Sequence, residues 1–230
     1  MTEKPGDYGT YLHVRELLTL QLPASPLDGP RHVVAAEHFF IVVHQAFELW
    51  FKQQLLDLRC AEDALALPAA DADLAYEHLA RVAAIQRLLN EQMQLLDFLP
   101  PRSILAFRGH LGTASGSESA QFYQLTAALG LRTPVESPLY RAFRVALTDV
   151  GVDLETLYRE PARAPGLYRV AEALADIAER FWLMTALHVR ITDRTIGDRP
   201  GTGGTSGVSY LMEALKEKAF PELWLVRTRL

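Results

Sequence analysis

Cysteine is almost absent from this chain, since Cys60 is the only one among 230 residues. A single cysteine cannot form an internal disulfide, so the sequence excludes a disulfide-stabilised secreted scaffold and is typical of a reducing compartment. Because Cys60 lies in an apolar helical stretch, we interpret it as a small buried hydrophobe rather than a nucleophile.

Long apolar runs and long basic runs are also missing. No segment approaches the roughly 18 uninterrupted apolar residues of a membrane span, and residues 1–11 lack the basic and apolar regions of a secretory signal. The net charge of −5 comes from interspersed acidic and basic residues, and no basic cluster could follow a phosphate backbone. We therefore expect a soluble cytoplasmic protein that binds neither membranes nor nucleic acid.

Strict alternation of apolar and polar residues, which indicates β-strands, does not occur, and there is no internal repeat. Apolar residues instead recur at three- and four-residue steps, which predicts helices separated by prolines and glycines. The predicted helices cover residues 33–59, 73–98, 102–110, 118–129, 138–150, 167–196 and 208–219, with a further turn at 221–224. We expect an all-α fold, a helical bundle in a single domain spanning residues 1–230.

Histidine is the residue type most able to carry chemistry here. None of the seven histidines forms a His-x-x-x-His pair or lies near a cysteine pair, so a structural zinc site is not supported. His44 and His188 both lie in apolar helical segments, where each could be an ordinary core histidine with one hydrogen-bond partner. Alternatively, His44 could be catalytic and His188 could be an axial haem ligand, because the macrocycle supplies the other four nitrogens.

Two polar features could bind a small molecule. Arg108 could form an ordinary ion pair, or it could hold a substrate carboxylate through two parallel hydrogen bonds. The loop at 201–207 lacks the lysine of a phosphate-binding loop and follows a helix, so we do not expect nucleotide binding. This loop could be a flexible linker, or it could present backbone N–H groups and the Thr202 hydroxyl to an amino acid.

Five motifs follow one another along the chain. They are Tyr-Gly-x-Tyr-Leu at 8–12, Phe-Ile-x-x-His-Gln-x-x-Glu-Leu-Trp-Phe-Lys at 40–52, Phe-Arg-x-x-Leu-Gly-x-x-Ser-Gly at 107–116, His-Val-Arg at 188–190 and Gly-Thr-Gly-Gly-Thr-Ser-Gly at 201–207. Together, and in this order, they closely resemble the tryptophan 2,3-dioxygenase family over most of the chain. The resemblance favours the functional interpretation of these residues over the ordinary structural one.

The resemblance implies an enzyme that opens the indole ring of L-tryptophan, or a substituted tryptophan, with O2 to give N-formylkynurenine. It implies haem b with His188 as the axial ligand of its iron, and Ser115 lining the opposite, O2-binding side. His44 would accept a hydrogen bond from the indole N–H, and Arg108 would hold the substrate carboxylate. Further implied substrate contacts are Phe40, Tyr11, Leu12, Thr202 and, from a neighbouring subunit of a homotetramer, Tyr8.

Three departures from the family pattern concern the surroundings of the site. Residues 35–37 are Ala-Ala-Glu where the family usually has His-Asp-Glu, and Met93 stands where a tryptophan commonly lies near the proximal histidine. The interval from Gly130 to His188 is also shorter than expected, as though helices covering the pocket had been removed. We therefore expect a more open or reshaped pocket.

Two alternative functions follow from the same resemblance. Related haem enzymes insert a single oxygen atom into tryptophan-like or tyrosine-like substrates, so a monooxygenase or hydroxylase is one alternative. A haem-binding sensor without turnover is the other. The amino-acid contacts implied for Arg108 and Thr202 argue against the sensor, which does not require them.

Overall fold

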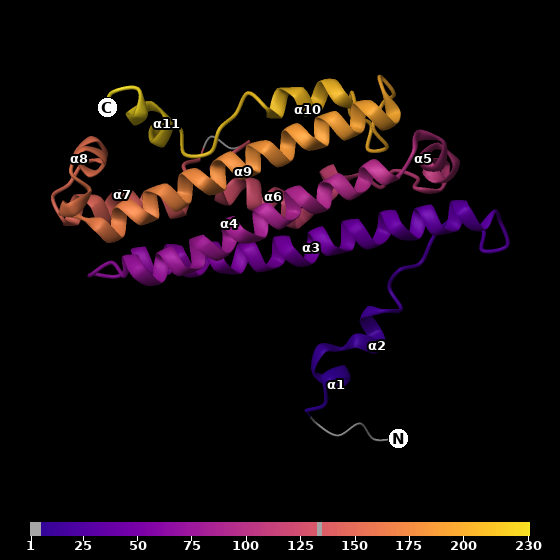
Figure 1. Ribbon diagram of the computed structural model, residues 1–230, viewed down its shortest axis with the longest axis horizontal. Helices are drawn as coiled ribbons and strands as arrows, with labels where there is room; N and C mark the ends of the chain where they lie inside the picture. Colours follow the sequence, from indigo (N-terminus) through magenta and orange to yellow (C-terminus); the bar gives the residue numbers. More distant parts are fainter. Residues whose placement is uncertain (1–5, 133–134) are drawn as a thin grey trace.

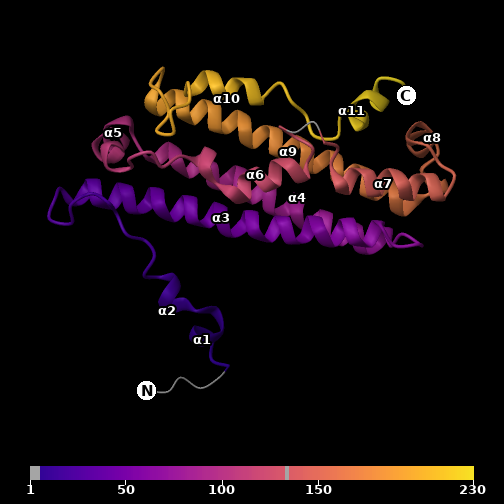
Figure 2. The same cartoon turned by 180° about the vertical axis from the view of Figure 1, so that it is seen from behind.

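Three long helices form the body of the protein. The computed structural model describes residues 6–132 and 135–230 and, within those ranges, contains helices but no strand. The helices α3 (Arg31–Leu65), α4 (Ala72–Gln94) and α9 (Pro165–Ile196) lie side by side along the long axis of the molecule (Figures 1 and 2). The predicted all-α bundle is confirmed.

The remaining helices are shorter. They are α1 (Tyr8–Leu12), α2 (Val14–Leu17), α5 (Pro101–Phe107), α6 (Ala120–Ala128), α7 (Pro138–Asp149), α8 (Leu154–Arg159), α10 (Val208–Ala214) and α11 (Pro221–Arg227). Short 3-10 turns occur at Leu95–Phe98, Arg108–His110, Gly116–Glu118 and Pro161–Arg163. In both views α10 lies along α9, and α6 lies against the bundle (Figures 1 and 2).

The helix predictions for 118–129, 138–150 and 167–196 agree with α6, α7 and α9 to within two residues. The first long helix runs on to Leu65, because Ala, Glu and Leu in the added segment are good helix formers. The second ends as an α-helix at Gln94 and tightens into a 3-10 turn, which is common at helix ends. The helix predicted at 208–219 ends at Ala214, and the turn predicted at 221–224 extends to Arg227.

Three short helices, α1, α2 and α8, are absent from the sequence predictions. Asp7 is the N-cap of α1 and accepts a hydrogen bond from the Thr10 backbone N–H, and Asp153 plays the same part for α8 with Thr156. An aspartate that satisfies an unpaired N–H at the start of a helix is a usable sequence signal. Such caps could therefore have revealed α1 and α8.

The core lies where α3, α4 and α9 meet. Its fully buried side chains include Leu58, Leu79, Leu89, Leu174 and Ile177. A polar chain crosses this apolar core, because the Gln54 amide donates to Gln86 Oε1 (3.0 Å) and Gln86 donates to Met184 Sδ (3.2 Å). These directional contacts fix how the three helices are rotated against one another.

Two neighbouring leucines on α4 test this packing. Leu89 is 0% exposed, whereas Leu88 is 41% exposed on the outer face of the same helix. We expect Leu89→Ala to lower the free energy of unfolding by about 2–5 kcal/mol, because it removes buried methyl groups and leaves a cavity. Leu88→Ala should change it by less than about 0.5 kcal/mol. Denaturant titration of both variants checks this, and equal losses would contradict the packing described.

The N-terminal segment reaches away from the bundle. In both views α1 and α2 lie apart from the long helices (Figures 1 and 2). The segment is attached to α3 through Gln45, which bonds Gln21 and the Leu20 carbonyl, and through the buried Glu37 carboxylate. Burial raises the pKa of Glu37, but hydrogen bonds donated by Ser25 and Ala24 outweigh it and leave the pKa lowered. The attachment therefore involves residues 20–25, and α1 lies beyond it.

No helix in the described part of the chain combines the length and the apolar character that crossing a bilayer requires.

Candidate active site

A cavity of about 330 Å³ lies inside the bundle, with α3 and α9 among its walls. Its lining is mainly apolar, and the aromatic rings that contribute are Phe40, Phe47, Phe51, Phe122, Phe181, Trp182 and Tyr210. His44 enters from α3 and His188 from α9. An apolar cavity of this size with a few polar groups is the usual form of a small-molecule site.

His44 is held in one tautomer by its own helix. Its Nδ1 lies 2.8 Å from the Phe40 carbonyl oxygen, and the two rings are 3.9 Å apart at their centroids. Because a carbonyl can only accept, Nδ1 carries the hydrogen and the neutral ring keeps its lone pair on Nε2. Burial lowers the pKa of His44, outweighing the Phe40 carbonyl and the Glu48 carboxylate, which raise it. A neutral imidazole that can accept a hydrogen bond therefore borders the cavity.

His188 is neutral for a similar reason. Burial is the main cause that lowers the pKa of His188 to about 4, and the nearby His44 ring lowers it further. Both histidines line the same cavity. Both residues have exposed surface in the structure and border the cavity, while the surrounding protein atoms desolvate their rings. Neutral imidazole is the form that binds metals.

The donor set around His188 restricts what kind of metal group could bind. Across residues 6–132 and 135–230, no three or more His, Cys, Asp or Glu side chains gather in a way that could hold a metal ion. One imidazole does not hold a bare ion, whereas it suffices for haem, whose macrocycle supplies four nitrogens. A neutral imidazole facing a mainly apolar cavity therefore fits haem.

Two loops meet at the cavity and border it with polar groups. Arg108, which follows α5, donates through Nη2 to the Pro200 carbonyl in the loop after α9. In return, the Thr202 hydroxyl of that loop donates to the Ala114 carbonyl (2.5 Å). Arg108 and Thr202 both line the cavity. The structure thus brings these two predicted residues together, in contact with main-chain carbonyl groups.

Gly203 shows how closely the two loops pack. A Cβ built at this position would lie 2.7 Å from Ser115 Cβ, too close for any other residue unless the loop moved. Ser115 lines the cavity, and its hydroxyl caps the 3-10 turn that follows it. The glycine-rich motif at 201–207 is therefore needed for close backbone approach, and the sequence interpretation of a flexible linker does not describe it.

The three predicted site residues in the N-terminal segment lie outside the cavity of their own chain. Tyr8, Tyr11 and Leu12 are 77%, 79% and 45% exposed on α1, and none of them lines the cavity of its own chain. Six of the nine predicted site residues do line it, namely Phe40, His44, Arg108, Ser115, His188 and Thr202. Met93, the departure noted near the proximal histidine, is buried and also lines the cavity.

Several cavity residues escaped the sequence interpretation. Arg132 lines the cavity from the segment after α6, and Tyr210 and Glu217 line it from the C-terminal segment. No local motif marks these three, because their place in the wall depends on how distant helices pack. Glu48 also lines the cavity, and its position one turn after His44 on the same helix could have revealed it.

Fold and cavity together define a class: an all-helical protein with an internal aromatic binding site, bordered by two neutral imidazoles and a guanidinium. The family model described as tryptophan 2,3-dioxygenase matches residues 2–152 and 140–230. The chain belongs to this family.

Relatives with the same name agree over nearly the whole chain. The tryptophan 2,3-dioxygenase of Caulobacter vibrioides is 35% identical over 266 aligned positions, covering 97% of this chain and 98% of the relative. Those of Kineococcus radiotolerans (37% identical) and Serratia proteamaculans (33%) cover 97% and 99% of this chain, and 91% and 94% of their own lengths.

The same comparisons locate a missing segment. The alignment with the Caulobacter protein spans 266 positions, more than the 230 residues of this chain, so the relative carries residues that this chain lacks. The family model matches in two stretches that overlap at 140–152, which coincides with most of α7. This agrees with the short interval between Gly130 and His188 noted in the sequence.

Proposed function

We propose that the protein opens the indole ring of L-tryptophan, or of a substituted tryptophan, with O2 to give N-formylkynurenine. The family membership supports this reaction. The observation that carries the proposal is geometric: His44, His188 and Arg108 come from three separate segments and meet at one aromatic cavity. A site for an aromatic amino acid and a planar cofactor requires such a set: apolar walls, a cofactor ligand and polar groups for the amino acid.

We also propose haem b as the cofactor, with His188 as its axial ligand and Ser115 beside it. The support is the neutral imidazole of His188, the aromatic lining of the cavity and the lack of other metal ligands among the described residues. When bound, the haem supplies the iron at which O2 is activated. The apolar walls keep water out of the site and leave the polar groups to orient the substrate.

Arg108 and Thr202 are the proposed contacts for the amino-acid end of the substrate. Arg108 now donates to a neutral carbonyl, and a carboxylate accepts a stronger, charge-assisted pair of hydrogen bonds from a guanidinium. Exchanging the Pro200 carbonyl for the substrate carboxylate would keep the guanidinium satisfied. Because Thr202 lies on the loop that Arg108 contacts, substrate binding would involve both loops at once.

His44 and Phe40 are the proposed contacts for the aromatic end. The lone pair on His44 Nε2 would accept the indole N–H, while the Phe40 ring, 3.9 Å from the imidazole, would pack against the substrate ring. Holding both ends fixes the carbon–carbon bond of the indole that is to be broken. His44 therefore acts by orienting the substrate, and it must be neutral to do so.

This role predicts how activity depends on pH. Burial lowers the pKa of His44 below its ordinary value of 6.5, so the ring is neutral at pH 7 and protonates only in more acidic solution. Protonation removes the acceptor. We expect kcat/KM for L-tryptophan to fall in acidic solution, with an inflection below pH 6.5. The acidic fall should disappear in His44→Ala, and its persistence there would contradict the assignment.

Isotope labelling tests the reaction itself. Ferrous protein incubated with L-tryptophan and ¹⁸O₂ should give N-formylkynurenine that carries two labelled oxygen atoms, measured by mass spectrometry. Incorporation of one labelled atom would favour the monooxygenase alternative. Haem binding without any product from tryptophan, methylated tryptophans or tyrosine would favour a sensor.

We further propose that the protein works in the cytoplasm as a homotetramer whose α1 reaches the cavity of a neighbouring subunit. The supporting observation is that Tyr8, Tyr11 and Leu12 are exposed on a segment that extends away from its own bundle (Figure 1). Exposed aromatic side chains near a chain end gain by covering an apolar site.

Subunit mixing tests this arrangement. Tyr11→Ala and Arg108→Ala should each be impaired alone, but co-assembled tetramers should recover part of the wild-type activity. The recovery is expected because an intact α1 from the Arg108→Ala subunit can complete an intact cavity in the Tyr11→Ala subunit. Absence of recovery in tetramers shown to contain both variants would contradict the exchange.

A further inference from the structure

The C-terminal segment forms one wall of the cavity. Tyr210, Leu211, Ala214, Glu217 and Ala219 all line it. However, α10, all of whose residues the structure describes, has none buried. Burial of apolar area is the main force that holds a helix in place. The position of this wall must therefore be maintained by something other than the packing of α10 itself.

A few exposed hydrogen bonds connect the wall to Trp182 of α9 and to Arg132. Trp182 Nε1 donates to the Leu215 carbonyl (3.0 Å), and the Arg132 backbone N–H donates to Glu217 Oε2 (2.9 Å). Arg132 also reaches the Tyr210 hydroxyl (3.2 Å). These groups are exposed, and exposed hydrogen bonds contribute little because water competes for them.

From Ala219, the last residue of the wall, the chain becomes firmly buried. Ala219, Phe220, Leu223 and Val226 are each no more than 4% exposed. Phe220 has a positive φ of 53°, which is rare for a bulky residue and is tolerated only where the surroundings impose it. Its ring stacks on Tyr140 of α7, with centroids 5.4 Å apart. The left-handed backbone at Phe220, which precedes α11, is thus held by contact with α7.

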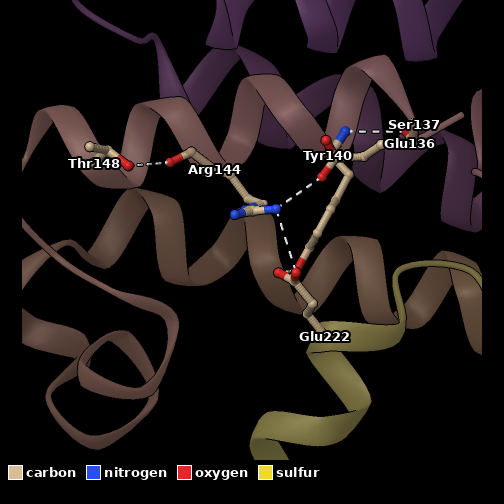
Figure 3. A network of polar contacts seen from close by, with 6 residues as sticks. All are labelled: Glu136, Ser137, Tyr140, Arg144, Thr148 and Glu222. Atoms are coloured by element: carbon tan, nitrogen blue, oxygen red, sulfur yellow. Dashed lines mark hydrogen bonds and ion pairs between the residues drawn. The ribbon is translucent and has the colours of Figure 1, made fainter.

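Tyr140 adds a hydrogen bond to this stacking contact. Its hydroxyl donates to Glu222 Oε2 on α11 (3.2 Å), and Arg144 Nη1 lies 3.5 Å from Glu222 Oε1 (Figure 3). Burial, followed by the Glu222 carboxylate, raises the pKa of Tyr140, so its hydroxyl remains a donor at any working pH. The Arg144 pair is about half exposed and contributes little, so Tyr140 is the stronger element of this contact.

We propose that Tyr140 is a positioning residue: by fixing α11 against α7, it sets the place of the cavity wall formed by residues 210–219. This wall borders the site of the proposed function, on which the kinetic part of the inference rests. Tyr140 lies on α7, the helix where the two stretches matched by the family model overlap.

Tyr140→Phe isolates the hydrogen bond. It keeps the ring and its stacking on Phe220, and it leaves Glu222, which is exposed, to be solvated by water. Glu136→Gln is the matched control, because Glu136 pairs with the same Arg144 (3.2 Å) but lies next to α7 in the chain and not on the C-terminal segment (Figure 3). Comparing the two variants distinguishes the effect of the Tyr140–Glu222 hydrogen bond from that of the neighbouring Arg144–Glu136 ion pair.

A lysine-specific protease, applied to the haem-loaded protein, measures how often the wall segment opens. Lys216 and Lys218 are exposed at the wall, whereas Lys52 lies within α3. Losing one hydrogen bond should let the segment open roughly two to ten times more often. We expect Tyr140→Phe to be cut faster at Lys216 and Lys218 by that factor, with Lys52 unchanged and Glu136→Gln like wild type.

The kinetic readout is a rise in KM for L-tryptophan in Tyr140→Phe that exceeds any change in kcat. If Tyr140→Phe were cut faster at Lys52 as well as at Lys216 and Lys218, the whole protein would be destabilised and the proposal would be overturned. Cutting at the wild-type rate together with an unchanged KM would also overturn it. If no variant, nor the wild type, turned over tryptophan, the proposed function would fail. The protease result would still decide whether Tyr140 positions the wall.

Discussion

His188→Ala should abolish or strongly weaken the Soret band of the purified protein. His188 is the only histidine on α9, and no alternative cluster of metal ligands lies in the described part of the chain. Without this imidazole the macrocycle would be held by apolar contacts alone. Absorption spectroscopy of the variant, purified with excess haem, measures the effect.

Two further variants protect this experiment from ambiguity. His188→Gly leaves space at the same position, and added imidazole should restore the Soret band if the ligand alone was lost. His38→Ala removes an exposed histidine from α3 and should bind haem like wild type. An unchanged spectrum in His188→Ala, or failure of imidazole to act on a variant that circular dichroism shows to be folded, would remove the ligand assignment.

Arg108→Ala should raise KM for L-tryptophan by roughly 30-fold or more. Truncating one partner of a buried charge pair costs about 2–5 kcal/mol, and the lower end applies because Arg108 is only partly buried. Arg108→Lys should recover only part of the loss, since an ammonium group cannot form the two parallel hydrogen bonds. Steady-state kinetics at saturating O2 measures both variants.

Tryptamine, which lacks the carboxylate, shows whether this loss arises from the contact itself. Wild type should prefer tryptophan over tryptamine, and Arg108→Ala should lose most of that preference. Arg199→Ala is the loop control, because Arg199 is exposed and donates to the Ile196 carbonyl at the end of α9. A preference for tryptophan that survives in Arg108→Ala would show that another group holds the carboxylate.

Local pattern was sufficient to predict what lies within one helix or one loop. The apolar periodicity of α3 and α9 placed His44 and His188 on helices, and the motifs marked Arg108 and Thr202. Their arrangement around one cavity brings together distant segments, and Arg108 contacts Pro200, which lies 92 positions later in the chain. The resemblance to a family supplied that part of the prediction.

Features that depend only on long-range packing were beyond the sequence interpretation. The left-handed backbone at Phe220 has no local cause, because an aromatic residue does not favour positive φ. It follows from stacking on Tyr140, 80 positions earlier in the chain. The wall formed by Tyr210 and Glu217 was missed for the same reason. Apolar periodicity and composition predict that a helix forms, but they do not predict which distant residues its end contacts.

The bond between His44 and the Phe40 carbonyl means that a main-chain atom decides which nitrogen of the imidazole bears hydrogen. Replacing the side chain at position 40 cannot remove that carbonyl. The ring that packs on His44 can therefore change in size while Nδ1 of His44 still carries the hydrogen and Nε2 still carries the lone pair. A ligand alkylated at its indole nitrogen would bring a methyl group to a lone pair that has lost its partner. With the role proposed for His44, discrimination against such a ligand would arise from the helix backbone.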